Sequence, residues 1–283
     1  MENQATQDQQ DMKRQMEIEQ QQIRQRMSRI NNKILVLSGK GGVGKSTVSV
    51  NLAISLALAG KKAGLLDIDI HGPSIPKVLN LEDARISSDG QDILPVEITN
   101  NLKVMSIGFL LQGKDTAIIW RGPRKYHMIK QFLKDVQWGS LDYLIIDSPP
   151  GTGDEPLSIV QLLEKCTGAI IVTTPQEVAL SDVRKGITFC RNLNVNILGV
   201  IENMSGFVCP KCGHKTDIFK SGGGEKMAEE MGVPFLGRIP IDPAIVEACD
   251  SGKPYIQQYK DSQAALAFKQ SVLQFIDLGQ KET

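Results

Sequence analysis

A glycine-rich segment at residues 39–47 constrains the fold of this chain more than any other feature. It reads Gly-Lys-Gly-Gly-Val-Gly-Lys-Ser-Thr and lies between a short apolar run and a helix-forming stretch. Successive glycines let backbone N–H groups surround phosphate oxygens without a Cβ in the way. Where such a loop joins a buried strand to a helix, the free N–H groups and the positive end of the helix dipole face the anion. The segment therefore predicts an α/β fold with a phosphate-binding loop.

The loop carries two lysines, Lys40 and Lys45, although the ordinary pattern G-x-x-x-x-G-K-[ST] needs only the second. We expect Lys45 to contact the outer phosphates of a nucleotide and the Ser46 hydroxyl to bind Mg²⁺. The additional Lys40 predicts a nucleotide site that a second molecule completes. The other predicted nucleotide contacts in the loop are Gly39, Gly41, Gly42, Val43, Gly44 and Thr47.

Apolar runs of strand length alternate with helix-length segments along most of the chain. The predicted strands are 34–37, 63–66, 102–107, 143–146, 169–173, 197–201 and 234–236. The predicted helices are 46–59, 123–136, 156–164, 177–191, 223–231, 243–250 and 262–277. Strands separated by helices imply right-handed βαβ units, and hence a mostly parallel sheet flanked by helices. Residues 81–101 are predicted to be an irregular insertion or hairpin with its turn at 88–90.

The first 32 residues differ in composition from the rest. They are mainly Gln, Glu, Arg and Met, and their apolar periodicity is limited to Met12, Met16, Ile23 and Met27. We therefore predict a flexible or helical polar extension over 1–32 that lies outside the core. Residues 33–283 are predicted to form one α/β domain with a cysteine-bearing loop at 205–220.

Three aspartates follow predicted strands, at the edge of the sheet where the metal ion of a nucleotide would lie. Asp67 and Asp69 follow one strand, and Asp147 ends another. One carboxylate near the γ-phosphate must orient the attacking water, while another reaches the Mg²⁺ shell. Asp147 is followed by Ser-Pro-Pro-Gly-Thr-Gly-Asp at 148–154, a segment that can be stiff in either of two arrangements and so suits a γ-phosphate sensor. The structural alternatives are a helix cap and a rigid turn.

Two of the five cysteines form a pair with metal-binding spacing. Cys209 and Cys212 stand in a C-x-x-C motif followed by His214, and this short turn directs two thiolates toward one metal. A tetrahedral zinc or an iron–sulfur cluster usually needs four ligands. Three completions are open: His214 with one distant ligand, a redox dithiol without a metal, or two cysteines from each chain of a dimer. Three other cysteines are expected to be small buried hydrophobes: Cys166, Cys190 and Cys249.

Bulk composition limits the class of partner. Lys+Arg and Asp+Glu both number 32, so the formal net charge is +0, whereas a dedicated nucleic-acid binder is usually basic. The N-terminus lacks the apolar region of a secretion signal, and no apolar run approaches the roughly 18 residues of a membrane span. We therefore expect no nucleic-acid partner, no membrane association and a cytoplasmic location.

The loop, the Asp67-x-Asp69 pair and the run at 147–154 resemble those of the deviant Walker A P-loop ATPases. This class includes MinD, ParA, the nitrogenase iron protein and the Mrp/ApbC scaffold proteins, and the resemblance covers nearly everything from residue 33 onward. It implies a P-loop NTPase fold that binds ATP and Mg²⁺. It also implies that Lys40 reaches the nucleotide of a dimer partner, that Asp69 positions water, and that Asp147 holds the Mg²⁺ hydration shell.

The same resemblance implies where the base and the cargo bind. Asn203 would recognise the adenine edge, and the segment from Pro240 to Asp242 would line the base pocket. The stretch 202–212, Glu-Asn-Met-Ser-Gly-Phe-Val-Cys-Pro-Lys-Cys, is similar to the Mrp/ApbC branch, in which the cysteine pair bridges a [4Fe–4S] cluster between subunits. The implied function is a homodimeric, slowly hydrolysing ATPase that takes a cluster from a donor and delivers it to apo iron–sulfur acceptor proteins. Zinc can occupy such a four-thiolate site in its place.

Two other functions fit the same nucleotide motifs. A MinD- or ParA-like positioning ATPase would act on a membrane or on DNA, but the predicted C-terminal helix carries one cation, Lys269, and is expected to pack into the core. A reductase like the nitrogenase iron protein would have a cluster cysteine in the switch segment, and residues 147–155 contain none.

Overall fold

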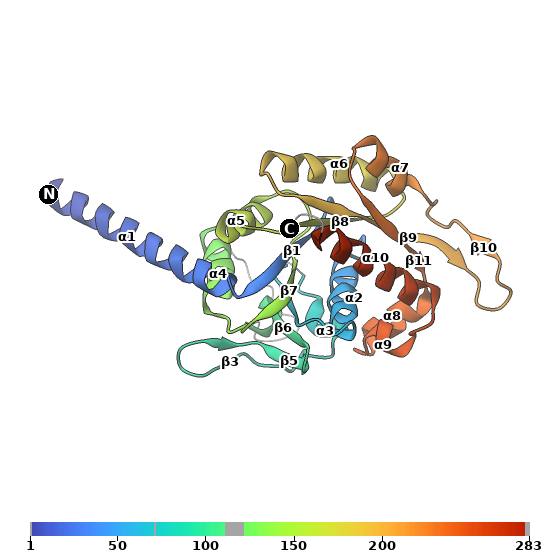
Figure 1. Cartoon of the computed structure of the whole chain (residues 1–283), viewed down its shortest axis with the longest axis horizontal. Coiled ribbons are helices and arrows are strands. Elements are labelled where there is room, and N and C mark those ends of the chain that lie inside the picture. The colour runs from blue at the N-terminus through green and yellow to red at the C-terminus, as the bar shows by residue number, and fades with distance from the viewer. Residues whose placement is uncertain (1, 71, 111–121, 281–283) are drawn as a thin grey trace.

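A nine-stranded sheet runs through the residues that the computed structural model describes, which are 2–70, 72–110 and 122–280 (Figure 1). Its strand order is β10-β9-β8-β1-β7-β2-β6-β5, with β11 paired to β9. The strands are β1 Ile30–Ser38, β2 Ala63–Asp67, β5 Val96–Thr99, β6 Leu102–Ser106, β7 Leu141–Asp147, β8 Gly168–Thr173, β9 Ile197–Val208, β10 Lys215–Thr216 and β11 Phe235–Ile241. A separate two-stranded sheet pairs β3 Ser87–Ser88 with β4 Ile93–Leu94.

The centre of the sheet is parallel and buried on both faces. β1 pairs in parallel with β7 and β8, and β2 pairs in parallel with β6 and β7. Every residue of β2 is buried, as expected for a strand with helices over both faces. The carboxyl ends of parallel strands meet at one edge, and the register here places Asp67 directly beside Asp147.

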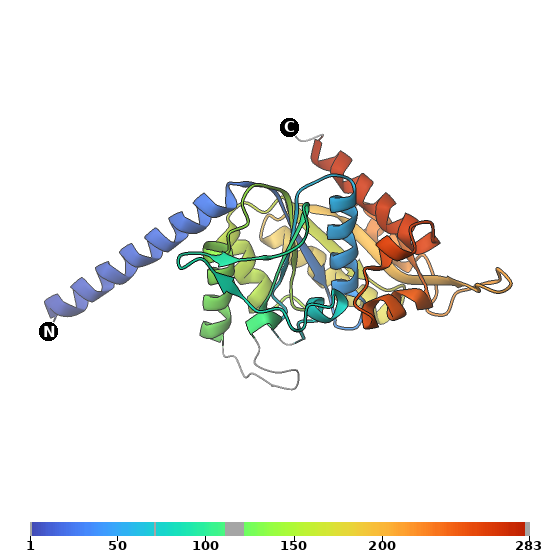
Figure 2. The same ribbon diagram turned by 90° about the horizontal axis from the view of Figure 1, so that it is seen from below.

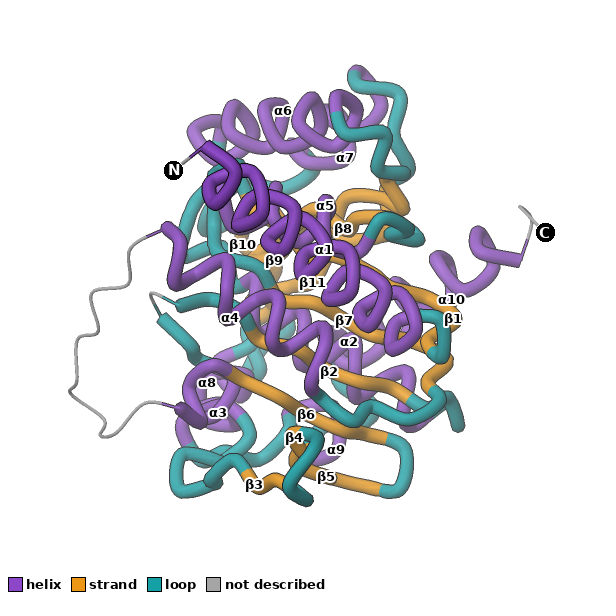
Figure 3. The backbone as a smooth tube through the Cα atoms, turned by 90° about the vertical axis from the view of Figure 1, so that its left-hand side faces the viewer, coloured by secondary structure: helices purple, strands orange, loops and turns teal. Residues whose placement is uncertain are grey.

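Helices cover both faces of the sheet. α2 packs against β1, β2 and β7, and α10 packs against β11 and α2, whereas α6 contacts β8 and α7 contacts β9. Figure 3 views the molecule from the side of α4 and α5, which lie in front of the sheet, while α2 lies behind it. The helices are α1 Glu2–Met27, α2 Lys45–Leu58, α3 Ile75–Val78, α4 Gly122–Asp135, α5 Asp154–Leu163, α6 Glu177–Asn192, α7 Gly223–Glu230, α8 Pro243–Asp250, α9 Tyr255–Gln258 and α10 Gln263–Gln280, with a 3₁₀ turn at Ile107–Leu110.

The predicted N-terminal extension is one long helix, α1, which projects from the body (Figures 1 and 2). Its last turns do not lie outside the core, so that prediction is wrong for this part of the extension. Ile23 and Met27 are buried, and α1 contacts α4 and α5. The guanidinium of Arg26 is paired with Asp92 at 2.5 Å. The domain also begins earlier than residue 33, because β1 starts at Ile30.

The most informative difference from the sequence prediction is the length of β9. A strand was expected at 197–201 with a loop from 205, but β9 continues to Val208 and pairs with the antiparallel β10. The continuation was hidden because Glu202, Asn203 and Ser205 are polar yet buried. β11 is likewise longer than the predicted strand at 234–236.

Two other expectations are confirmed. The insertion at 81–101 contains the β3–β4 hairpin, with the carboxylate of Asp89 accepting the N–H of Asp92 at 2.8 Å. The C-terminal helix packs into the core through Phe268, Val272 and Phe275. Among the described residues, no helix is both long enough and apolar enough to span a membrane.

The burial of α1 predicts a local difference in stability along one helix face. Ile23 and Met16 are seven residues apart on that face, but Ile23 is 1% exposed and Met16 is 58% exposed. Ile23→Ala should lower the free energy of unfolding by about 2–5 kcal/mol, whereas the matched Met16→Ala should change it by less than about 0.5 kcal/mol. Urea unfolding measures both, and equal effects would contradict the packing described here.

Candidate functional site

The glycine-rich loop joins the end of β1 to the start of α2 and surrounds a cavity of about 250 Å³. Gly42 and Gly44 both have φ of 80°, a left-handed conformation that favours glycine. A Cβ on Gly44 would lie 2.3 Å from the side-chain nitrogen of Asn203, and one on Gly39 would lie 2.5 Å from the backbone of Asp182. These contacts explain why the loop needs glycine at both places.

Most of the predicted nucleotide contacts line this one cavity. Its walls carry both lysines and the hydroxyl groups at the start of α2, and one aspartate faces them from the end of β2. The predicted residues on the walls are Lys40, Gly41, Gly42, Gly44, Lys45, Ser46, Thr47 and Asp69. The two remaining loop residues serve its structure, because Gly39 packs on α6 and the buried Val43 accepts a hydrogen bond through its carbonyl.

Asp147 lies fully buried behind this cavity and is the best-satisfied carboxylate of the site. Its Oδ1 lies 2.8 Å from the ammonium of Lys45 and accepts the hydroxyl of Ser49 at 2.6 Å. Its Oδ2 accepts the hydroxyl of Ser46 at 2.6 Å. Three donors, from Lys45, Ser46 and Ser49, therefore converge on this one buried carboxylate.

Asp67 lies beside Asp147 on the neighbouring strand and is also fully buried. Its carboxylate accepts the hydroxyl of Ser106 at 2.8 Å and the N–H of Asp69 at 3.1 Å. Burial, together with the charge of Asp147, raises the pKa of Asp67 to about 8. Asp69 itself faces the cavity.

The segment after Asp147 closes one side of the loop. Pro150 lines the phosphate cavity, and the N–H of Gly151 donates to the carbonyl of Ser38 at the end of β1. The hydroxyl of Ser148 donates to the carbonyl of Val36 at 2.8 Å. This segment is therefore bonded to β1, the strand that carries the loop.

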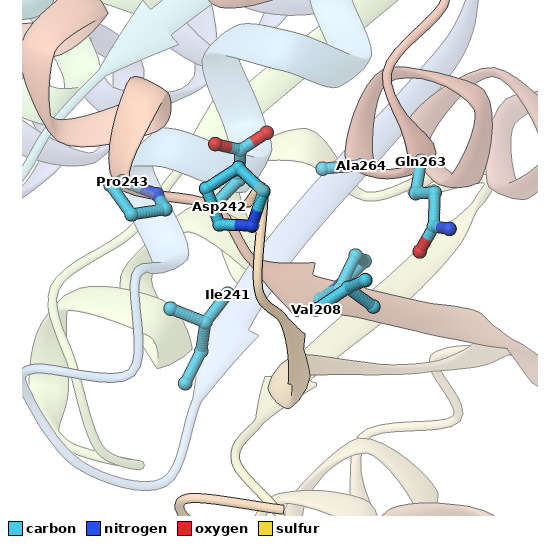
Figure 4. A pocket seen from close by; sticks show the side chains of 8 residues that line it. Val208, Ile241, Asp242, Pro243, Gln263 and Ala264 are labelled. Carbon is cyan, nitrogen blue, oxygen red and sulfur yellow. The ribbon is translucent and has the colours of Figure 1, made fainter. Parts of the chain in front are cut away.

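Of the residues implied in base recognition, Asn203 contacts the loop, whereas Pro240 and Asp242 line a separate pocket. The side-chain amide of Asn203 donates to the carbonyl of Val43 at 2.9 Å. Pro240 and Asp242 line a second pocket of about 220 Å³, whose opposite wall includes Gln263 at the start of α10 (Figure 4). The carboxylate of Asp242 also caps α8, accepting the N–H of Ala244 at 2.9 Å.

The cysteine pair lies on a projecting hairpin formed by the end of β9 and β10 (Figure 1). The N–H of Cys209 donates to the carbonyl of His214, and the N–H of Gly213 donates to the carbonyl of Cys209, both at 2.9 Å. Cys212 is exposed and Cys209 is half-buried. The backbone N–H groups of Lys211 and Cys212 lower the pKa of the Cys209 thiol, which favours its thiolate.

The hairpin is held at its base by Glu202, a residue that the sequence analysis did not assign. Its fully buried carboxylate accepts the N–H of Gly222 at 2.8 Å, and it also accepts the N–H of Gly224 and the hydroxyl of Ser205. Glu202 thus joins the strand that enters the hairpin to the helix that follows it. Ser49 and Ser106 were missed in the same way, because a lone serine in a helix or strand forms no motif.

The cysteine pair offers two thiols on one short turn, which also contains His214. The part of the chain that the structure describes contains no group of three or more His, Cys, Asp or Glu side chains placed to hold one metal ion. Of the three other cysteines, Cys190 is fully buried, and Cys166 and Cys249 are half-buried. Burial raises the pKa of all three thiols.

Similarities to known proteins identify the family of this chain. The profile of a ParA-type family described as NUBPL iron-transfer P-loop NTPase matches residues 29–276. The iron-sulfur cluster carrier protein of Methanocaldococcus jannaschii is 54% identical over 262 residues, which cover 92% of this chain and 90% of that protein.

Solved structures share the fold. A nucleotide-binding protein from Archaeoglobus fulgidus in complex with ADP has a TM-score of 0.74 and 41% identity, covering 83% of this chain and 92% of that chain. The cell division ATPase MinD of Pyrococcus furiosus has a TM-score of 0.66 and 26% identity, covering 88% of this chain and 99% of that chain. The α/β fold with a mostly parallel sheet is therefore that of the MinD/ParA P-loop NTPases. By profile and by identity, the chain belongs to the Mrp/NUBPL-type P-loop NTPases, the family of iron–sulfur cluster carrier proteins.

Proposed function

We propose that this chain is an ATPase that dimerises, binds a [4Fe–4S] cluster between its two subunits and transfers the cluster to apo-proteins. The observation that carries the proposal is the course of β9. This single strand contains Asn203, which contacts the phosphate loop, and leads directly into Cys209. A change in the nucleotide site therefore has a short covalent path to the thiolates that would hold the cluster.

The nucleotide cavity supports binding of ATP with Mg²⁺. Lys45 and the N–H groups at the start of α2 face the space that the phosphates would fill. The hydroxyl of Ser46 and the carboxylate of Asp147 are the hard oxygen donors that Mg²⁺ prefers, and they lie 2.6 Å apart. When bound, Mg²⁺ would neutralise charge that develops on the phosphates. Asp69 would orient water, since it lines the cavity and its backbone N–H is held by the carboxylate of Asp67.

Lys40 supports a site completed by a second chain. It lines the phosphate cavity from the glycine-rich turn, while the ammonium of Lys45 already serves the same cavity and Asp147. In the proposed dimer, Lys40 reaches the phosphates bound by the partner subunit and stabilises the charge of the transition state there. The base would lie near Asn203 and the segment from Pro240 to Asp242.

The hairpin supports a cluster shared between subunits. Two thiolates from each of two chains related by a two-fold axis supply the four ligands that a [4Fe–4S] cluster requires. An exposed hairpin leaves the cluster accessible to an acceptor protein, and Cys212 is exposed. A positioning ATPase is less well supported, because MinD of Pyrococcus furiosus is 26% identical to this chain and the cluster carrier of Methanocaldococcus jannaschii is 54% identical.

Anaerobic reconstitution with iron and sulfide tests the cargo. Cys209→Ala and Cys212→Ala should each reduce bound iron and sulfide to the background level, because a dimer would retain half of its thiolate ligands. Cys249→Ala is the matched control, since this half-buried thiol lies on α8 outside the hairpin, and it should load like the parent. Parental iron and sulfide in Cys209→Ala would show that the cluster lies elsewhere.

Mixing two inactive variants tests whether Lys40 acts across the dimer. Lys40→Ala should lower the ATPase rate by about 100-fold or more while ADP affinity stays nearly unchanged, as for a catalytic cation supplied in trans. Lys45→Ala should also be inactive. An equimolar mixture should recover roughly a quarter of the parental rate, because half of the random dimers contain one complete site. A mixture as inactive as its components would mean that Lys40 acts within its own chain.

A further inference from the structure

Ser49 is a buried hydroxyl that no nucleotide motif includes. It lies on α2, one turn after Ser46, and it is fully buried behind the residues that line the phosphate cavity. Its Oγ lies 2.6 Å from Oδ1 of Asp147 and 3.1 Å from the carbonyl oxygen of Lys45. A hydroxyl has one proton to donate, and the shorter contact to the ionised oxygen is the stronger one. Ser49 is therefore a donor to Asp147.

The three donors to Asp147 differ in what a nucleotide would do to them. Lys45 and Ser46 line the cavity, so a phosphate and a metal ion would attract them away from the carboxylate. Ser49 has no such competing partner in the cavity, because it points from α2 toward the sheet. A buried carboxylate that loses hydrogen-bond donors is costly, and its side chain tends to reorient toward the donors that remain. Ser49 would therefore remain a donor to Asp147 when phosphates and a metal ion occupy the cavity.

We propose that Ser49 is a positioning residue for Asp147. It fixes Oδ1, so that Oδ2 keeps facing Ser46 and the position of Mg²⁺ when Lys45 turns to the phosphates. The inference rests on the proposed function only in that the site must bind a nucleotide with Mg²⁺; it is independent of the cluster and of the dimer. Ser49 would act on the metal through Asp147 and would touch neither nucleotide nor water.

The chain offers a matched control on the same helix. Ser55 is a buried serine of α2, and among the described residues its hydroxyl has no hydrogen-bond partner. Ser55→Ala thus removes the same oxygen from the same helix without changing the surroundings of Asp147. Any general loosening of α2 should appear in both alanine variants.

Binding of ADP, measured by calorimetry with EDTA and then across a Mg²⁺ titration, tests the proposal. In EDTA, Ser49→Ala should bind ADP like the parent, because Lys45 and the loop N–H groups hold the phosphates. The Mg²⁺ concentration for half-maximal strengthening of ADP binding should rise by about ten-fold or more, as for other residues that orient a metal ligand. Ser55→Ala should leave it unchanged, and Ser49→Thr, which keeps the hydroxyl, should restore it.

The remaining outcomes separate a positioning role of Ser49 from a merely structural one. A parental Mg²⁺ requirement in Ser49→Ala, or an equal shift in Ser55→Ala, would overturn the positioning role. If Ser49→Ala does not fold, Ser49→Cys replaces it, since a thiol is a weak donor, and a parental Mg²⁺ requirement in that variant would overturn the role equally. A parent chain that binds ADP with Mg²⁺ but does not hydrolyse ATP would contradict the proposed ATPase and leave this readout intact.

Discussion

The nucleotide site is organised by the ion pair and the hydrogen bonds of the buried Asp147 carboxylate. It lies at the end of β7, in the middle of the sheet, and it binds two residues of the phosphate loop region and one of α2. A fully buried charge is tolerated only when it is paired and hydrogen-bonded. This requirement holds the loop against the sheet. Burial, together with the charge of Asp147, also raises the pKa of the neighbouring Asp67.

The polar groups of the nucleotide site bond to one another. Lys45 forms an ion pair with Asp147, and the hydroxyl of Ser46 donates a hydrogen bond to it. In the proposed function, a nucleotide and its metal ion would compete for these two groups. The side-chain amide of Asn203 likewise donates to the carbonyl of Val43 in the loop. In the proposed function, a bound nucleotide would replace these contacts, and β9 would connect that change to the cysteines. Glu202 fixes the base of the hairpin, and it lies next to Asn203 on the same strand.

The sequence predicted the parts of this protein that follow periodic or motif rules. The buried strands around β1, the glycine-rich loop and the edge where Asp67 meets Asp147 follow from apolar runs and parallel pairing. The sequence failed where buried polar residues interrupt an apolar pattern. β9 was cut short at Ile201 because Glu202 and Asn203 look like loop residues, although each is buried and hydrogen-bonded.

Tertiary packing explains the remaining differences. The polar helix α1 was expected outside the core, yet its end is buried because Ile23 and Met27 find an apolar surface on α4 and α5 that no local rule reveals. Ser49 and Ser106 gained their significance in the same way, because each touches a carboxylate that is distant in sequence. Family resemblance supplied the assignment of Asn203 and the cysteines, which spacing alone left open.

In the proposed function, one partner chain would complete both the nucleotide site and the cluster site. Native mass spectrometry of the anaerobically reconstituted protein tests it most directly, because it counts chains and cluster in one particle. We expect a particle of two chains with a single [4Fe–4S] cluster. When the cluster is removed in the absence of ATP, this particle should dissociate into cluster-free monomers. A cluster held by a single chain would contradict it.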